Sequence, residues 1–292
     1  MRRALAIPSR LLILALVVGA SYGAYAYGGS AVGETTATYS VGGIDLKVDS
    51  KAYYNSLPRP QSTWSAKDLQ PYYDKFFNIQ DVKPGDTGTT TISLHIKKAS
   101  AWVCLAFKDF KEKENGRNEP EKLADATQNT GELGKGMEFF AWFDDGDNKF
   151  EIGEKPLFGT TSQSAIQTLK NKSYPLADAK HGSPWSKDSV HYVGIAWCAG
   201  DLGVNLATAK VSCNGNALGN EAQTDSLSFS VALEAVPYTQ NKKFECAKSK
   251  AGHGRDDEDN DDDDDDDEHH YSWYNYGDDD GYGGACNDGK KS

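Results

Sequence analysis

The segment DSLSFSVALEAV (225–236) decides the fold class, because apolar residues recur along it at every second position. Leu227, Phe229, Val231 and Leu233 fall on one side of an extended chain, and mostly small or polar residues fall on the other. A period of two residues is typical of a strand with one buried and one wet face. The segment therefore predicts a strand in a sheet that covers a core.

Five more segments extend this pattern through the chain. IDLKVD (44–49) and TISLHIK (91–97) alternate in the same way, whereas AWVCLAF (101–107), MEFFAWF (137–143) and HYVGIAWC (191–198) are apolar on both faces. Strands of the second kind suit the middle of a sandwich, or a sheet covered by another part of the chain. We predict an all-β fold, a two-sheet jelly-roll sandwich spanning residues 42–247.

Helical patterns are scarce. Residues 132–137 and 162–169 each predict a turn or two of helix, inserted between strands. The polar segment 108–130 predicts a long insertion loop.

The amino terminus has the pattern of a signal peptide, residues 1–26. Arg2 and Arg3 precede an apolar run (11–18), and Ala24-Tyr25-Ala26 has the A-x-A form of a cleavage site. The run is short for a membrane span, which needs about 20 apolar residues. We expect a secreted protein of the extracellular matrix or cell surface that meets the membrane only through this segment; an uncleaved anchor is the alternative.

The carboxyl-terminal segment 248–292 concentrates the acidity of the chain. Residues 256–280 hold fifteen of the 43 acidic residues, so the rest has 28 against 31 basic residues and is nearly neutral. Seven consecutive aspartates repel one another and predict disorder. The tail is either a solvated brush or a weak binder of calcium and other matrix components. The chain has no basic face that would bind nucleic acid.

Five cysteines indicate an oxidising compartment. Cys198 and Cys213 enclose a short loop, and a bridge between them would stabilise the fold by about 3 kcal/mol. The preferred pairing is therefore Cys198 with Cys213 and Cys104 with Cys246, one of three possible connectivities. Cys286 is either an idle thiol or a cross-link between subunits.

The segment DDGDNKFEIGE (144–154) is a candidate calcium loop, because calcium takes six to eight oxygen ligands. Its candidate ligands are Asp144, Asp145, Asp147, Glu151 and Glu154. The EF-hand pattern is not met, and the alternative is a tight hairpin between residues 139–143 and 149–152.

Motifs of catalysis are missing from the sequence. It contains no HExxH pair of zinc-binding histidines, no GxSxG nucleophile turn and no phosphate-binding glycine loop. His95 alternates with apolar neighbours and is expected to face solvent from a strand. We therefore predict that the protein is not an enzyme and has no certain cofactor.

Several segments together resemble the TasA/camelysin family of secreted proteins, in its cysteine-containing archaeal and bacterial branch. They are GGIDLKVDS (42–50), FFNIQDVKPGDTGTTTISLHIKKASAW (76–102), FFAWFDDGDNKFEIGE (139–154), HYVGIAWCAGD (191–201) and NEAQTDSLSFSVALEAVPYTQNKKFEC (220–246). The resemblance implies a jelly-roll subunit of biofilm-matrix fibres or bundling pili. The subunits would form a homopolymer by donor-strand complementation, in which the amino-terminal segment of one completes the sheet of the next.

In this sequence the donor corresponds to residues 27–41. This segment is rich in β-branched residues and has no proline, so its backbone can pair along its length. The candidate donor residues are Ala31, Val32, Thr36, Ala37, Thr38, Tyr39 and Val41. The alternatives are a first strand within the same molecule and a floppy terminus.

A rival function uses the same sandwich differently. A monomeric binding module at the cell surface, for calcium or carbohydrate, could line a face with Trp102, Trp142, Trp185 and Trp197. In strands such residues more often belong to the core.

Overall fold

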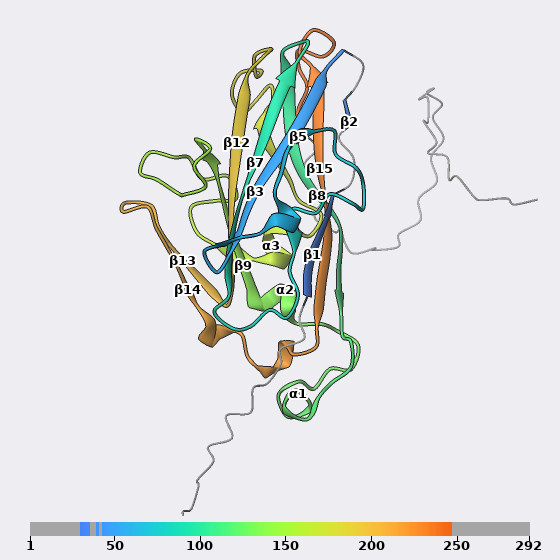
Figure 1. Cartoon of the computed structure of the whole chain (residues 1–292), viewed down its shortest axis with the longest axis vertical. Coiled ribbons are helices and arrows are strands. Elements are labelled where there is room, and N and C mark those ends of the chain that lie inside the picture. Colours follow the sequence, from blue (N-terminus) through green and yellow to red (C-terminus); the bar gives the residue numbers. More distant parts are fainter. Residues whose placement is uncertain (1–29, 36–38, 41–42, 247–292) are drawn as a thin grey trace, which may run out of the picture. The chain divides into compact units, whose positions relative to one another are not determined.

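The computed structural model describes residues 30–35, 39–40 and 43–246. Two large sheets of mainly antiparallel strands pack against each other (Figure 1), which confirms the all-β sandwich. The six-stranded sheet has the order β11–β8–β15–β1–β6, with β2 also paired to β15. Its strands are β11 (Ser173–Ala177), β8 (Ala101–Lys113), β15 (Ser226–Pro237), β1 (Ser30–Thr35), β6 (Phe77–Asn78) and β2 (Tyr39–Ser40).

The seven-stranded sheet has the order β10–β9–β12–β7–β3–β4, with β5 also paired to β3. Its strands are β10 (Gln163–Ser164), β9 (Met137–Asp144), β12 (Val190–Ala199), β7 (Thr87–Lys97), β3 (Asp45–Tyr54), β4 (Leu57–Pro58) and β5 (Trp64–Lys67). A separate hairpin is formed by β13 (Asp201–Asn205) and β14 (Lys210–Asn214).

The helices of the described residues are short. They are α1 (Glu119–Ala124), α2 (Leu133–Gly136) and α3 (Ala165–Leu169), with 3-10 turns η1 (Pro60–Ser62), η2 (Gly215–Ala217) and η3 (Asn220–Ala222). Helices α2 and α3 fall in the two segments predicted to be helical.

The prediction of a loop over residues 108–130 is wrong at the start and in the middle of that segment. Strand β8 continues to Lys113, because its backbone keeps pairing with β15 as far as Ser226. Helix α1 starts at a capping box, in which the side chains of Asn118 and Glu121 each accept a hydrogen bond from the other's backbone N–H.

The main core lies between the two sheets. Aromatic rings join the layers: Phe139 of β9 contacts Phe77 of β6 at 6.2 Å and Phe229 of β15 at 6.4 Å between ring centroids. Residues Leu227, Phe229 and Val231 are all buried there, as the alternation of the segment predicted.

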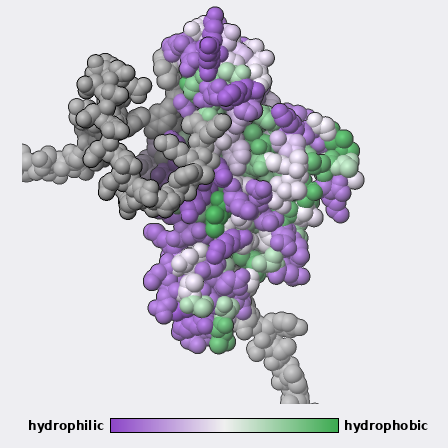
Figure 2. Space-filling view, turned by 180° about the vertical axis from the view of Figure 1, so that it is seen from behind, coloured by the Kyte–Doolittle hydropathy of each residue, from purple (hydrophilic) through white to green (hydrophobic). Residues whose placement is uncertain are grey.

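A second apolar cluster lies on the other face of the seven-stranded sheet. Phe140, Trp142 and Cys198 pack there with Leu202 of the hairpin β13–β14, which covers β9 and β12. This cover explains why these two strands are apolar on both faces. The face of the molecule in Figure 2 is mainly hydrophilic, with hydrophobic residues in separate groups.

Two glycines in this sheet lie directly beneath tryptophans of the neighbouring strand. Gly194 pairs with Trp142, and a Cβ atom added to it would lie 2.2 Å from the indole ring. Gly88 pairs with Trp197 in the same way, at 2.2 Å. The absence of a side chain therefore lets each indole occupy the space where a Cβ atom would lie.

Replacing Gly194 with alanine is expected to lower the free energy of unfolding by about 1–3 kcal/mol, the usual cost of overpacking a dense core. Gly203→Ala in β13 is the matched control, because the closest atom to its added Cβ is the hydroxyl of the exposed Ser212 side chain. Urea unfolding followed by tryptophan fluorescence measures both. Equal effects at the two positions would contradict this account of the Gly–Trp pairs.

Candidate functional site

The amino-terminal segment lies along one side of β15. Strand β1 runs parallel to β15, from Ser30 opposite Ser226 to Thr35 opposite Val231. Further along, β2 places Tyr39 opposite Glu234. Of the candidate donor residues, Ala31 and Val32 lie in β1 and Tyr39 in β2, whereas Thr36, Ala37, Thr38 and Val41 lie outside the described residues.

Strand β15 has a different neighbour on each side. Strand β8 pairs with it from Ser226 to Pro237, and the amino-terminal segment pairs with the opposite side. Beyond β1, β6 adds only two pairs, Val32 with Asn78 and Gly33 with Phe77. Strand β1 thus fills a slot between β15 and β6, which we call the β15 slot.

In this single chain the β15 slot is filled by the chain's own segment, the arrangement that the sequence left open as an intramolecular first strand. The segment joins the body near Gly43, whose φ of +110° lies in the left-handed region. No atom lies within 4 Å of a Cβ added there. The backbone turns at this glycine before β3 begins in the other sheet.

The acidic loop after β9 is larger than the tight hairpin given as the alternative to a calcium loop. The N–H of Phe143 donates to the carbonyl of Lys155 (2.9 Å), and the N–H of Leu157 donates to the carbonyl of Ala141 (2.7 Å). The chain therefore returns at residues 155–157 and not at 149–152, because eleven residues (144–154) separate the innermost paired positions, 143 and 155. The tight-hairpin prediction is wrong.

Asp144 anchors this loop to the sheet. It is buried, and its carboxylate accepts hydrogen bonds from the Trp142 indole (3.0 Å), the Thr91 hydroxyl (2.9 Å) and the Asn148 N–H (3.3 Å). Oxygen atoms of Asp144, Asp145 and Asp147 lie within 4.8 Å of one another. The structure thus brings together three of the five candidate calcium ligands.

Most carboxylates of the loop already accept backbone hydrogen bonds. Asp145 accepts one from Asp147 (3.2 Å), and Glu154 accepts one from Asp145 (3.1 Å) and one from Glu151 (2.7 Å). Burial raises the pKa of Glu154, and the N–H of Glu151 opposes that rise. These bonds account for the loop's shape without an ion, so calcium at Asp144–Glu154 stays a prediction.

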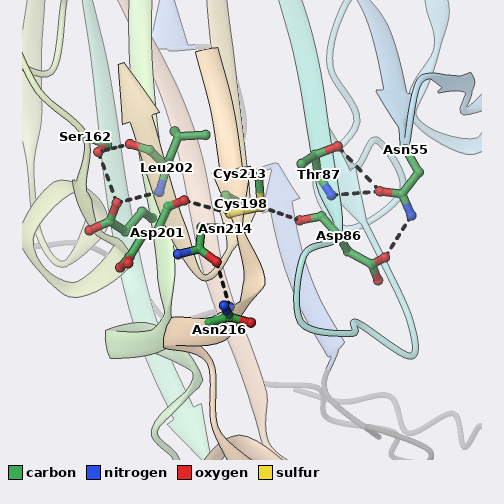
Figure 3. Close-up of a disulfide and its surroundings, with 11 residues drawn as sticks. Asn55, Asp86, Thr87, Ser162, Cys198, Asp201, Leu202, Cys213, Asn214 and Asn216 are labelled. Atoms are coloured by element: carbon green, nitrogen blue, oxygen red, sulfur yellow. Dashed lines mark hydrogen bonds between the residues drawn. A yellow bond between two sulfur atoms is a disulfide. The ribbon is translucent and has the colours of Figure 1, made fainter. Parts of the chain in front are cut away.

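One disulfide fixes the hairpin β13–β14 to the sheet. Cys198 of β12 is bonded to Cys213 of β14, with their Cα atoms 5.6 Å apart. Figure 3 shows this bond beside Asp86, whose carbonyl oxygen lies 3.7 Å from the Cys213 sulfur. Asn55 bridges the same turn, donating to the Asp86 carboxylate (2.8 Å) and accepting from the Thr87 N–H (2.8 Å).

The other disulfide holds the last described residues against β8. Cys104 is bonded to Cys246, with Cα atoms 5.7 Å apart and a separation of 142 positions in the sequence. The pairing is the one preferred from the sequence. Two disulfides suggest an oxidising, extracellular environment. Cys286, the signal segment and the acidic tail lie outside the described residues.

The aromatic and histidine candidates occupy structural positions. Trp102, Trp142, Trp185 and Trp197 are all buried. His95 is partly exposed on β7, as expected, and its ring nitrogen lies 2.6 Å from the carboxylate of Asp49 on β3.

Sequence reasoning missed one group of acidic side chains, which we call the five-carboxylate cluster. Its members are Glu114, Glu121, Asp125, Glu132 and Asp225. They form two triads that share Glu114: one with Glu121 and Asp225, the other with Asp125 and Glu132. Within each triad, carboxylate oxygen atoms lie within 4.8 Å of one another. Burial and the nearby carboxylates raise the pKa of Asp225 to about 7, although the N–H of Glu132 opposes this rise. The wide spacing of the five residues matches no motif, and only the capping pair at residues 118 and 121 left a local signal.

The longest helix among the described residues has six residues, so none of these helices could span a membrane. No protein-family model matches the chain, and no curated protein matches its sequence. The likeness to the TasA/camelysin family therefore rests on the quoted motifs.

Proposed function

We propose that the protein is a secreted structural subunit that polymerises by donor-strand complementation into fibres of the biofilm matrix or bundling pili. In the fibre, residues 27–41 of one copy occupy the β15 slot of the next. Each subunit then gives its own segment to a neighbour and receives another. The TasA/camelysin-like motifs and the two disulfides are in keeping with this function.

The β15 slot is the observation that carries the proposal. Strand β15 is buried in the core at Leu227, Phe229 and Val231, yet one side of its backbone pairs only with the amino-terminal segment among the described residues. Without that segment, a row of N–H and C=O groups would lie open beside the core. Such an edge binds an extended strand from another chain readily.

Exchange of the segment preserves the pairing that the single chain makes. Backbone hydrogen bonds in the slot depend on the register of β1 and not on which copy supplies it, as in domain swapping. A turn at Gly43 is the point where the segment could leave its own subunit. At high protein concentration, exchange then links copies head to tail without loss of the strand contacts.

Cross-linking between chains is the test. Val32 in β1 is opposite Ser228 in β15, and neighbouring strands lie about 4.8 Å apart, within the range of a disulfide. Two chains of different size are mixed, one carrying Val32→Cys and the other Ser228→Cys, and both also carry Cys286→Ser. We expect them to form a mixed disulfide-linked dimer on oxidation. A non-reducing gel of the assembled mixture measures it.

A chain carrying Glu234→Cys is the control for register. Glu234 lies six positions beyond Ser228 on the same strand, roughly 20 Å away at the usual rise per residue. Cross-linking of Val32→Cys to this position should be much weaker. If the disulfide forms only when both cysteines are in one chain, the segment does not exchange and the proposal is wrong.

The four tryptophans do not support the alternative function, a carbohydrate-binding module. A sugar-binding face needs exposed rings, and Trp102, Trp142, Trp185 and Trp197 are buried. We therefore favour the fibre subunit over a carbohydrate-binding module.

A further inference from the structure

The five-carboxylate cluster joins segments that are far apart in the sequence. Glu114 follows β8, Glu121 and Asp125 belong to α1 and its end, Glu132 begins α2, and Asp225 directly precedes β15. The cluster thus lies where the insertion that carries α1 meets the start of β15, at the end of the sandwich shown with α1 in Figure 1.

Glu121 and Asp225 are the two most buried members, and hydrogen bonds hold one carboxylate oxygen of each. The Oε2 atom of Glu121 accepts from the Asn118 N–H at 3.2 Å. The Oδ2 atom of Asp225 accepts from the N–H groups of Glu132 and Leu133, the latter at 3.2 Å. The orientation of these two carboxylates is therefore set by backbone N–H groups.

Hydroxyl and amide groups hold the other three in the same way. The Oδ1 atom of Asp125 accepts from the Thr127 N–H at 2.7 Å, and the Thr127 hydroxyl lies 3.1 Å from Oε1 of Glu132. The Oε1 atom of Glu114 lies 3.3 Å from the Thr224 hydroxyl. A backbone N–H thus holds Asp125, whereas Glu114 and Glu132 each share the single proton of a threonine hydroxyl with other acceptors.

The second oxygen of each carboxylate is buried and has no hydrogen-bond partner among the described residues. These atoms are Glu114 Oε2, Glu121 Oε1, Asp125 Oδ2, Glu132 Oε2 and Asp225 Oδ1. Glu121 and Asp225 are 0% exposed and Asp125 is 6% exposed, so water does not replace the missing donors readily. Buried polar atoms without partners are rare in folded proteins, and a bound ion is one of the arrangements that satisfies them.

The charges of the cluster are also unbalanced. Among the described residues, the cluster has one ion pair, in which the guanidinium of Arg117 lies 3.8 Å from Oδ2 of Asp125. Lys135 acts on Glu132 from a greater distance, so two cations face five carboxylates. Burial raises the pKa values of Glu121, Glu132 and Asp225 in the absence of further positive charge. Burying carboxylates without opposite charge costs several kcal/mol per ion.

We propose that Glu114, Glu121, Asp125, Glu132 and Asp225 bind calcium. Carboxylate oxygens in two triads that share Glu114, without a histidine or cysteine, suit a hard cation, and calcium accepts six to eight oxygens in flexible geometry. Magnesium fits less well, because it demands a near-ideal octahedron and keeps several waters. The site is distinct from the acidic loop at Asp144–Glu154, whose carboxylates are largely occupied.

Calcium in this site would fasten the α1 insertion to β15. Asp225 directly precedes Ser226, the residue of β15 that is opposite Ser30 at the start of β1. The ion therefore stabilises the end of the sandwich at which the β15 slot begins. The proposal does not depend on strand exchange, since it concerns contacts within one chain.

Calcium titration of the mature full-length protein, after treatment with chelator, tests the site. We expect calorimetry to detect one or two tight sites per chain, and about 1 mM calcium to raise the unfolding midpoint by about 5 °C or more. The double variant Glu121→Gln/Asp225→Asn should lose both effects. Without calcium it should be at least as stable as the wild type, because it no longer buries those two charges.

The variant Asp145→Asn/Asp147→Asn in the acidic loop is the matched control and should keep the tight binding. It also separates the cluster from weak binding by the tail, which all variants retain. If the double variant of the cluster does not fold, Glu132→Gln, at a partly exposed position, replaces it. Unchanged calcium binding in the cluster variants, or an equal midpoint shift with magnesium, would overturn the assignment.

Discussion

Replacing Cys104 and Cys246 together with alanine is expected to lower the free energy of unfolding by about 5 kcal/mol, since the bond closes a very long loop. The same change at Cys198 and Cys213 should cost about 3 kcal/mol. The difference follows from the sequence separations of 142 and 15 residues, because a longer loop removes more entropy from the unfolded chain.

Denaturant unfolding of the two double variants measures these losses, and alanine pairs avoid the reshuffling that partial reduction would cause. The first variant should melt about 10–20 °C below the wild type, given about 2–4 °C per kcal/mol for a domain of this size. Cys104, Cys246 and Cys198 are buried residues, so packing losses add to the effect of each replacement. A larger loss at Cys198–Cys213 would mean that anchoring of the hairpin β13–β14, and not loop length, dominates.

The alternation of apolar residues was sufficient to predict the strands but not their neighbours. Residues 225–236 predicted a strand with Leu227, Phe229 and Val231 in the core, and β15 has that form. Periodicity reports which face of a strand is buried. It does not say that β15 lies between β8 and a parallel β1, because pairing is decided by contacts between distant parts of the chain.

The sequence led to wrong predictions for two polar segments whose structure depends on contacts with distant parts of the chain. The segment FKDFKEK (107–113) reads as polar, yet it extends β8 because β15 offers a paired edge. The Asp-Gly dipeptide at residues 145–146 suggested a tight turn, but the buried carboxylate of Asp144 supports a longer loop.

The five-carboxylate cluster shows the same limit at the level of a site. Its members are separated by 7, 4, 7 and 93 positions in the chain, so no window of sequence contains them all. The carboxylates of the acidic loop at residues 144–154 lie close together in the sequence and therefore form a visible pattern. Contiguity, however, lets neighbouring backbone N–H groups satisfy those oxygens, whereas the dispersed set leaves five oxygens without donors.

Deleting residues 27–41 is expected to abolish fibres and to leave a soluble, less stable subunit. Loss of the pairs along β15 removes several backbone hydrogen bonds, each worth about 0.5–1.5 kcal/mol, so stability should fall on the order of 3–6 kcal/mol. Electron microscopy of the mature protein and of the truncated chain, at equal concentration, measures assembly. Fibres of normal length from the truncated chain would exclude this segment as the connector.

A synthetic peptide of residues 27–41 provides the complementary result. Added to the truncated chain, it should bind one to one and restore thermal stability without restoring fibres, because a free peptide fills the β15 slot but links no second subunit. A peptide carrying Gly33→Pro is the control. Gly33 is opposite Phe229 on one side and Phe77 on the other, so proline removes an N–H from this double pairing. Equal binding of the two peptides would show that the peptide attaches elsewhere, since strand addition in the slot requires that backbone group.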